Sequence, residues 1–262
     1  MRMGAFGESP PLATPTTGAW LLALVLLPWP VAALLQRLIP SISRREAALV
    51  AYNLAAVSPN IYMAYVGCYT YWADEGAAAA HASAHGRLYA PLAPAASMIS
   101  VCIAYELWNT LAAFALPEYR TAAYVGHHAS TLCLALLCTA PFLHYYSLFF
   151  LGPPSVSSVL LGLVDIFRHT GLHSYLPTTN LVVRLLFALA FLATRSMMWP
   201  YVSACFWRDV GGVLAAGTSH SAWSCTVYLA ANVFLTGLQL IWTVRIVRGL
   251  WKAIVGGGSK EE

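Results

Sequence analysis

The chain has 262 residues, of which 59% are hydrophobic and only 9% are charged, and its mean hydropathy is +0.66. Soluble domains carry about 25% charged residues, so this composition excludes an ordinary soluble domain and predicts a polytopic membrane protein. The 14 basic and 10 acidic residues leave a net charge of +4, and the longest basic run is Arg44-Arg45, which excludes a nucleic-acid-binding surface.

Residues 1–17 are rich in Pro, Ser, Thr and Gly, which predicts a disordered tail. A membrane-spanning helix needs about 20 mostly apolar residues. The first such run is long for a signal peptide and lacks a small-residue cleavage site, so we expect a retained helix; a cleaved signal is the alternative. The sequence predicts an all-α fold of about seven transmembrane helices, at residues 18–39, 46–72, 93–116, 123–143, 146–168, 179–205 and 222–250.

Two connections carry local signals. Residues 73–92 are rich in Ala, His and Gly and are expected to form a loop, and the prolines of LGPPS (151–155) predict a break early in the fifth segment. The predicted domain organisation is a disordered tail, an N-terminal helix with its connection, a main helical domain and a C-terminal tail, at residues 1–17, 18–45, 46–250 and 251–262.

The distribution of Lys and Arg predicts the orientation, because cytosolic loops retain basic residues. With seven helices, one side collects Arg37, Arg44, Arg45, Arg120, Arg168, Arg245, Arg248, Lys252 and Lys260. The other side collects only Arg2, Arg87 and Arg208. We therefore expect a cytosolic C-terminus and a lumenal or extracellular N-terminus.

Polar side chains lie inside the apolar segments, where a charge costs several kcal/mol and needs a partner or a purpose. Glu106 and Asn109 are three residues apart and share a helix face, whereas Arg184 and Arg195 are eleven apart and fall nearly on one stripe. Arg184 is expected to reach the cytosolic interface. Glu106 can pair with Arg195 and join two helices, or the two can bind a ligand. Asp165 can equally cap a helix end.

His127 and His128 stand side by side at the start of the fourth segment. Their side chains point about 100° apart on a helix, so one can face the centre of the bundle while the other contacts a neighbouring helix. A single histidine near a membrane surface is usually an interfacial side chain. Two adjacent ones, with Ser130 and Thr131 close by, favour a functional site.

A metal site is not expected. Among eight histidines only His169 and His173 have an HxxxH spacing, no HxxHH occurs, and no carboxylate lies within one turn of His127. The six cysteines show no CxxC pair and are interpreted as small core residues.

Four stretches resemble the TLC-domain family, which contains ceramide synthases, TRAM-like translocon proteins and TLC-domain-containing lipid-regulating proteins. They are YELWNT (105–110), PEYRTAAYVGHHASTLCLAL (117–136), LFFLGPPSVSSVLLGLVDIFR (148–168) and LVVRLLFALAFLATR (181–195). The resemblance covers roughly residues 46–250. It implies a six-helix bundle around a lipid-sized cavity, with an additional N-terminal helix.

In ceramide synthases a histidine pair and a downstream His-Asp-x-x-Asp segment line the reaction centre, where an acyl group passes from acyl-CoA to an amine. His127 and His128 match the pair and Asp165 matches the first Asp, whereas Val164 and Arg168 replace the other two residues. The resemblance implies His127 or His128 as base or nucleophile and Asp165 as the group that orients the imidazole. The two departures place the chain nearer the lipid-regulating members than authentic ceramide synthases.

The expected substrate-binding residues are Glu106, Asn109, Ser158 and Arg195. The expected role is in membrane lipid homeostasis in the endoplasmic reticulum, with a membrane lipid or fatty acyl chain as ligand. An acyl-CoA-dependent transfer to a lipid amine or hydroxyl, without a bound cofactor, is one interpretation. A non-catalytic lipid-binding or regulating protein and a partner in protein export are the others. A homodimer is also left open.

Overall fold

The computed structural model describes residues 14–138 and 141–255, and within these ranges it holds helices and no strand. The long helices are α1 (Pro15–Leu26), α2 (Pro28–Leu38), α3 (Arg44–Ala73), α6 (Ala93–Ala115), α7 (Ala122–Leu137), α8 (His144–Thr170), α10 (Pro177–Phe191), α11 (Trp199–Ala215) and α12 (Ala222–Val255). A π-helical segment, η3 (Leu192–Met198), joins α10 to α11. The short helices are α4 (Glu75–His81), α5 (Ala84–Tyr89), η2 (Pro117–Tyr119) and α9 (Leu172–Tyr175).

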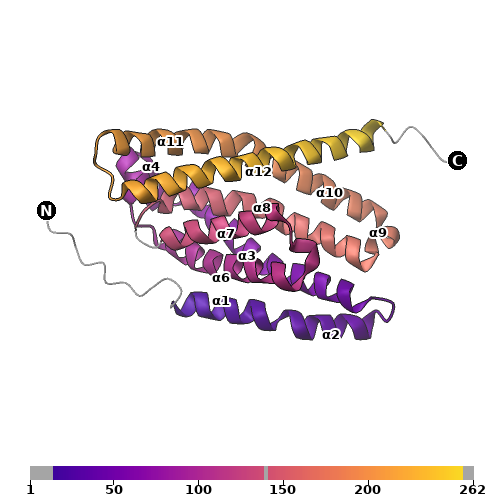
Figure 1. The fold of residues 1–262 in the computed structure, drawn as a ribbon. Helices are drawn as coiled ribbons and strands as arrows, with labels where there is room; N and C mark the ends of the chain where they lie inside the picture. Colours follow the sequence, from indigo (N-terminus) through magenta and orange to yellow (C-terminus); the bar gives the residue numbers. More distant parts are fainter. Residues whose placement is uncertain (1–13, 139–140, 256–262) are drawn as a thin grey trace.

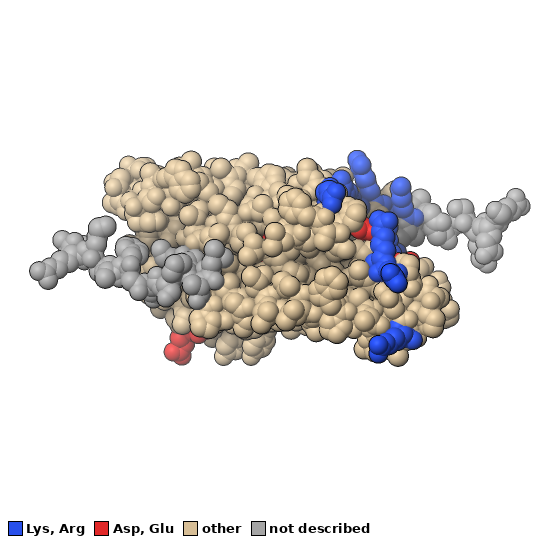
Figure 2. Space-filling view, turned by 60° about the horizontal axis from the view of Figure 1, so that its bottom comes forward, with Lys and Arg blue, Asp and Glu red and all other residues tan. Residues whose placement is uncertain are grey.

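The long helices run roughly side by side in one bundle (Figure 1). α1 and α2 lie along one side and pack on α6 and α3, while α11 and α12 lie on the opposite side. α3, α6, α7 and α8 fill the space between them. α1 begins at one end of the bundle and α12 ends at the other, and on the face in Figure 2 the Lys and Arg side chains gather at the end where α12 ends.

Five helices of the described chain are long and apolar enough to cross a membrane: Pro15–Leu38, Ala93–Ala115, His144–Thr170, Pro177–Ala215 and Ala222–Lys252. The chain is therefore a multi-pass membrane protein. The sequence predicted about seven such helices. The two others are α3, which has 30 residues but buries polar side chains such as Asn53 and Asn60, and α7, which has only 16 residues.

The two predicted tails are shorter than expected. Thr14 caps α1, because its Oγ1 accepts a hydrogen bond from the Thr17 N–H at 3.1 Å, so helix begins inside the predicted 1–17 tail. At the other end α12 continues to Val255. The remaining tail residues, 1–13 and 256–262, lie outside the described residues.

The predicted loop at 73–92 is wrong in part, because it contains α4 and α5. The Asp74 carboxylate accepts a hydrogen bond from the Ala77 N–H, and the Ser83 hydroxyl accepts one from the Gly86 N–H. These N-caps satisfy backbone donors that would otherwise be free, and alanine favours helix more than any other residue. The capping residues were therefore visible in the sequence.

The predicted break at LGPPS is also wrong, since α8 runs unbroken through Pro153 and Pro154. Prolines are tolerated in membrane helices when neighbouring groups compensate for the disturbed backbone. The missing N–H groups of Pro153 and Pro154 free the carbonyls of Phe149 and Phe150, four residues earlier. α8 nevertheless continues to Thr170 and carries Ser158 past the prolines.

α3 and α8 make the closest helix contact of the bundle core at Gly67 and Gly152. A Cβ atom built on Gly67 would lie 2.3 Å from the Gly152 Cα, and one built on Gly152 would lie 2.5 Å from the Gly67 Cα. Only glycine fits on either side, because backbone atoms rather than flexible side chains would be struck. Such small-residue contacts let membrane helices approach closely and gain van der Waals packing.

A buried ion pair closes the bundle at the end near α4 and α5. Arg87 donates from Nε and Nη2 to the two Asp209 oxygens at 2.5 and 2.8 Å, and the Tyr146 hydroxyl donates to the same carboxylate at 2.6 Å. The hydrogen bonds from Arg87 to Asp209 raise the pKa of the guanidinium, so it stays charged. Because the Asp209 side chain is only 2% exposed, this carboxylate depends on its partners.

Substituting either contact glycine should destabilise the protein. Gly67→Ala and Gly152→Ala should each cost about 1–3 kcal/mol, because the helices must move apart, and should lower the Tm in detergent by roughly 2–10 °C. Gly237→Ala on α12 is the matched control, since a Cβ atom at this position would meet nothing within 4 Å. Equal Tm values for all three variants and the unmodified protein would contradict the close contact.

Removing Arg87 should leave the Asp209 carboxylate buried without its counter-charge. Arg87→Ala is expected to cost about 3–5 kcal/mol, whereas Arg87→Ala combined with Asp209→Asn should cost less, because no stranded charge remains. Arg208→Ala is the control, because this side chain is 70% exposed beside the same carboxylate. Thermal unfolding of the variants measures the effect, and additive losses for Arg87 and Asp209 would show that they do not act as a pair.

Candidate functional site

A cavity lies inside the bundle, between α3, α6, α7, α8, α11 and α12. It encloses about 1000 Å³ of unfilled space, part of it at its open side. Leucine, phenylalanine and other apolar side chains form most of the wall. Polar side chains also line it, among them Asn60, Glu106, His127, His128, Arg195 and Gln239. An apolar pocket with few polar groups is typical of a site for a largely hydrophobic ligand.

The strongest polar contact at the wall joins α6 and α7. The His128 Nδ1 and the Glu106 Oε2 are 2.5 Å apart, and both residues are buried. In a neutral imidazole, an Nδ1–H that donates to the carboxylate leaves the lone pair on Nε2. Nε2 has no hydrogen-bond partner among the described residues. A carboxylate that orients an imidazole is the arrangement that catalytic bases and nucleophiles use.

His127 faces a different neighbour, as the 100° offset between adjacent helical residues predicts. Its ring meets the Trp242 ring edge to face, with 5.5 Å between centroids, and the His128 ring at 5.0 Å. Its Nδ1 is buried and has no hydrogen-bond partner in the described chain. A buried polar atom without a partner is costly, so this nitrogen is available to a ligand.

Arg195 enters the cavity from the π-helical segment η3. Its guanidinium donates to the Ser157 and Ser158 hydroxyls, both at 2.9 Å, and to the Gln239 amide oxygen at 3.4 Å. π-helical turns are rare and occur frequently at functional sites. The two arginines have different surroundings, because Arg184 is exposed on α10 while Arg195 lines the cavity.

The predicted pairing of Glu106 with Arg195 is wrong. Both residues line the cavity, but no ion pair within 4 Å joins them in the described chain. Glu106 is bound to His128 on the neighbouring helix, and Arg195 is bound by neutral groups of α8 and α12. Each group has a nearer partner: His128 for Glu106, and the hydroxyl and amide oxygens of α8 and α12 for Arg195.

Asp165 does not line the cavity with the histidine pair, contrary to the prediction. It follows Ser158 by seven residues on α8, which places it about 10 Å further along the helix axis. Ser158 reaches the cavity wall and Asp165 does not. The carboxylate that contacts the histidine pair is Glu106, because α6 packs directly beside α7.

Asn109 also lies outside the cavity, although it shares a helix with Glu106. Its Oδ1 accepts hydrogen bonds from the Tyr52 and Tyr124 hydroxyls, and it is fully buried. Tyr52 stacks on Trp108 with 4.6 Å between ring centroids. Asn109 therefore belongs to an aromatic cluster that packs α3, α6 and α7 together, rather than to the predicted substrate-binding set.

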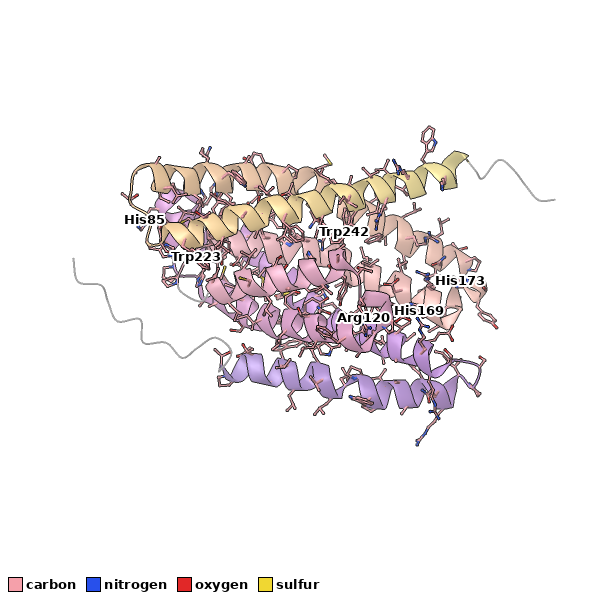
Figure 3. All side chains as sticks on the ribbon, viewed as in Figure 1. His85, Arg120, His169, His173, Trp223 and Trp242 are labelled. Atoms are coloured by element: carbon pink, nitrogen blue, oxygen red, sulfur yellow. The ribbon has the colours of Figure 1, made fainter. Side chains whose placement is uncertain are left out.

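Three further residues at or beside the site were not among the predicted site residues, although Gln239 is recognisable in the sequence as a polar residue inside an apolar segment. Gln239 and Trp242 lie one turn apart on α12, and Tyr146 lines the cavity from α8. A glutamine inside an apolar run was the available signal for Gln239, whereas the two aromatic residues look like ordinary core. Trp242 lies midway along α12, and His169 and His173 lie further toward the end of the bundle (Figure 3). No group of three or more metal-ligating side chains occurs among the described residues.

Comparison with known proteins agrees with this architecture. No curated protein sequence matches the chain significantly. The model of the TLC domain, the family of TRAM, LAG1 and CLN8, matches residues 50–248, which include every cavity-lining residue discussed above. The chain, a multi-pass helical membrane protein with a largely apolar internal cavity, belongs to the TLC-domain family.

Proposed function

We propose that this protein acts in membrane lipid homeostasis by transferring an acyl chain to a lipid amine or hydroxyl, with His128 as the catalytic residue. The observation that carries the proposal is the hydrogen bond between Glu106 and His128 at the wall of an apolar cavity. The apolar wall suits an acyl chain, and the oriented imidazole suits proton or acyl transfer.

The proposed reaction uses acyl-CoA as co-substrate. His128 Nε2 takes a proton from the lipid amine or hydroxyl while the nitrogen or oxygen attacks the thioester carbonyl. The carbon–sulfur bond then breaks, and the leaving thiolate receives the proton from the imidazolium. Glu106 stabilises the imidazolium that forms between the two steps. In a variant of this path the Nε2 first accepts the acyl group itself and then passes it on.

A non-catalytic lipid-binding role is the second candidate. The observations that favour it are that Val164 and Arg168 replace two residues of the His-Asp-x-x-Asp segment, and that Asp165 lies away from the cavity. In that role the same cavity holds a lipid without changing it. The protein would then regulate the lipid that it binds.

We place the protein in the endoplasmic reticulum membrane with seven crossings, six of them forming the bundle around the cavity. α3 and α7 supply the two crossings that fall short in hydropathy or length. α7 is short but continues the row of helices between α6 and α12, and α3 packs closely against the apolar α8. The gathering of basic side chains at one end supports a cytosolic C-terminus and a lumenal N-terminus (Figure 2).

Loss of the imidazole should abolish the lipid function without loss of folded protein. In cells that lack the protein, His128→Asn should fail to restore the lipid composition, and Glu106→Gln should restore it poorly, since general acid–base groups contribute about 10²–10⁴-fold to rates. His173→Ala, at an exposed histidine of α9, should restore it fully. Lipidomics at matched protein levels measures the outcome, and full rescue by His128→Asn would exclude catalysis and leave the binding role.

The seven-crossing topology predicts opposite locations for the two ends of the chain. A tag placed after Glu262 should be digested by protease in intact microsomes, and a tag placed before Met1 should be protected until detergent is added. A third tag, inserted between α6 and α7 beside Arg120, should be digested like the first. Protection of both terminal tags, or digestion of both, would contradict the odd number of crossings.

A further inference from the structure

The Arg195 guanidinium brings a positive charge to the cavity, and only neutral groups contact it. Its four acceptors are the Ser157 and Ser158 hydroxyls, the Pro154 carbonyl and the Gln239 amide oxygen, at 2.9–3.4 Å. No carboxylate lies within 4 Å of it in the described chain. A guanidinium has five N–H donors, so one N–H of Nη1, on the side of Gln239, has no acceptor. Removing a charge from water without a counter-charge is costly, so the site favours an anion.

Gln239 supplies a second unsatisfied donor beside this charge. The residue is 2% exposed, and while its amide oxygen accepts from Arg195, its Nε2 has no partner in the described part of the chain. A buried amide N–H₂ without an acceptor costs about 1–3 kcal/mol. An acceptor atom of a ligand would satisfy the free Arg195 N–H and the Gln239 N–H₂ together.

His127 lies on the same side of the cavity. Gln239 and Trp242 are three residues apart and share a face of α12, and the Trp242 ring contacts the His127 ring. His127 thus faces the same stretch of α12 that contacts Arg195, and its buried Nδ1 has no partner among the described residues. Three helices therefore bring a charge and two unsatisfied polar groups to one part of the wall.

Among the described residues that line this wall, Glu106 is the one carboxylate, and its nearest polar partner is His128 rather than Arg195. Glu106 is hydrogen-bonded to His128, and no ion pair within 4 Å joins it to Arg195 in the described chain. The cavity consequently has a basic subsite at Arg195 and a separate hydrogen-bonded acid–imidazole pair. A neutral lipid headgroup would leave the Arg195 charge and the Gln239 amide without a counterpart.

We propose that Arg195, Gln239 and His127 bind a single oxyanion, a phosphate or a carboxylate, that belongs to a lipid whose acyl chain fills the apolar part of the cavity. The inference rests on the proposed function for the lipid nature of the ligand, and it adds the chemical class of the headgroup. Guanidinium binds phosphate and carboxylate oxygens through charge-assisted hydrogen bonds, and the amide adds a donor to the same group. The acyl chain supplies most of the buried surface.

The headgroup preference can be measured on the full chain purified in a nonionic maltoside detergent, by native mass spectrometry with three lipids that share a palmitoyl chain. Palmitate offers a carboxylate, palmitoyl lysophosphatidic acid offers a phosphate, and 1-monopalmitoylglycerol is the neutral control. We expect at least one anionic lipid to bind about tenfold or more tightly than the neutral one, and the better of the two identifies the oxyanion. Equal affinities for all three lipids would overturn the proposal.

Two variants and a matched control locate the preference. Arg195→Gln should remove it, and Gln239→Leu should weaken it about three- to tenfold, because one donor is lost while the charge remains. Arg184→Gln, at an exposed arginine on α10 eleven residues before Arg195, should retain the preference for anionic lipids. If Arg195→Gln keeps the preference, the guanidinium only joins η3 to α8 and the proposal fails. If that variant does not fold, Gln239→Leu decides, and an unchanged preference overturns the proposal.

Inorganic phosphate is the fourth probe, because it carries the oxyanion without the acyl chain. Binding equal to that of palmitoyl lysophosphatidic acid would overturn the assignment to a lipid. Neither the lipid-binding measurement nor the phosphate-binding measurement requires an acyl donor or turnover. The anion preference can therefore hold while His128→Asn rescues the cell, in which case acyl transfer fails and the subsite stands. The preference can also fail while His128 proves essential.

Discussion

Hydrocarbon offers no hydrogen-bond partners, and this constraint governs where each polar side chain of the bundle lies. Every ionisable group that the apolar helices carry inward has to find a partner within the protein or supply one to a ligand. The buried Glu106–His128 hydrogen bond follows from this constraint. It holds α6 against α7, uses the carboxylate on one side, and leaves an imidazole nitrogen directed at the cavity.

The same constraint sorts the polar groups into three clusters with different properties. Between α3, α6 and α7 the Asn109 oxygen accepts from Tyr52 and Tyr124, which contributes to packing, while the Asn109 amide nitrogen has no partner among the described residues. Arg87 and Asp209 neutralise each other at the end of the bundle. The cavity cluster also has buried atoms without partners, on His127 of α7 and Gln239 of α12, and it adds a guanidinium and the Glu106-bound imidazole of His128 at the wall of a cavity. The cavity and the charge beside it, rather than an unsatisfied atom alone, distinguish this cluster from the structural polar contacts.

The sequence predicted the fold well where hydropathy decides it, and less well where neighbours decide it. The long apolar runs predicted the order and approximate limits of the helices, since burial in lipid requires such runs. The unbroken α8 could not be predicted from Pro153 and Pro154, because prolines that break a helix in water are tolerated in a membrane helix packed among its neighbours. Similarly, the histidine pair was recognisable locally, but the identity of its carboxylate was not. Glu106 is 22 residues from His128 in the chain, and only the packing of α6 on α7 selects it over Asp165.

The π-helical segment shows how a local irregularity sets the chemistry of the cavity. In an uninterrupted α-helix, residues eleven apart lie nearly on one stripe, so Arg195 would face the same surroundings as the exposed Arg184. Arg195 lies within the i→i+5 turn over Leu192–Met198, and its guanidinium donates to groups of α8 and α12. The wider turn forgoes the tighter α-helical hydrogen bonding, and the four hydrogen bonds of the guanidinium offset that cost. The chain therefore holds an uncommon turn and a partly unsatisfied charge together at the cavity wall.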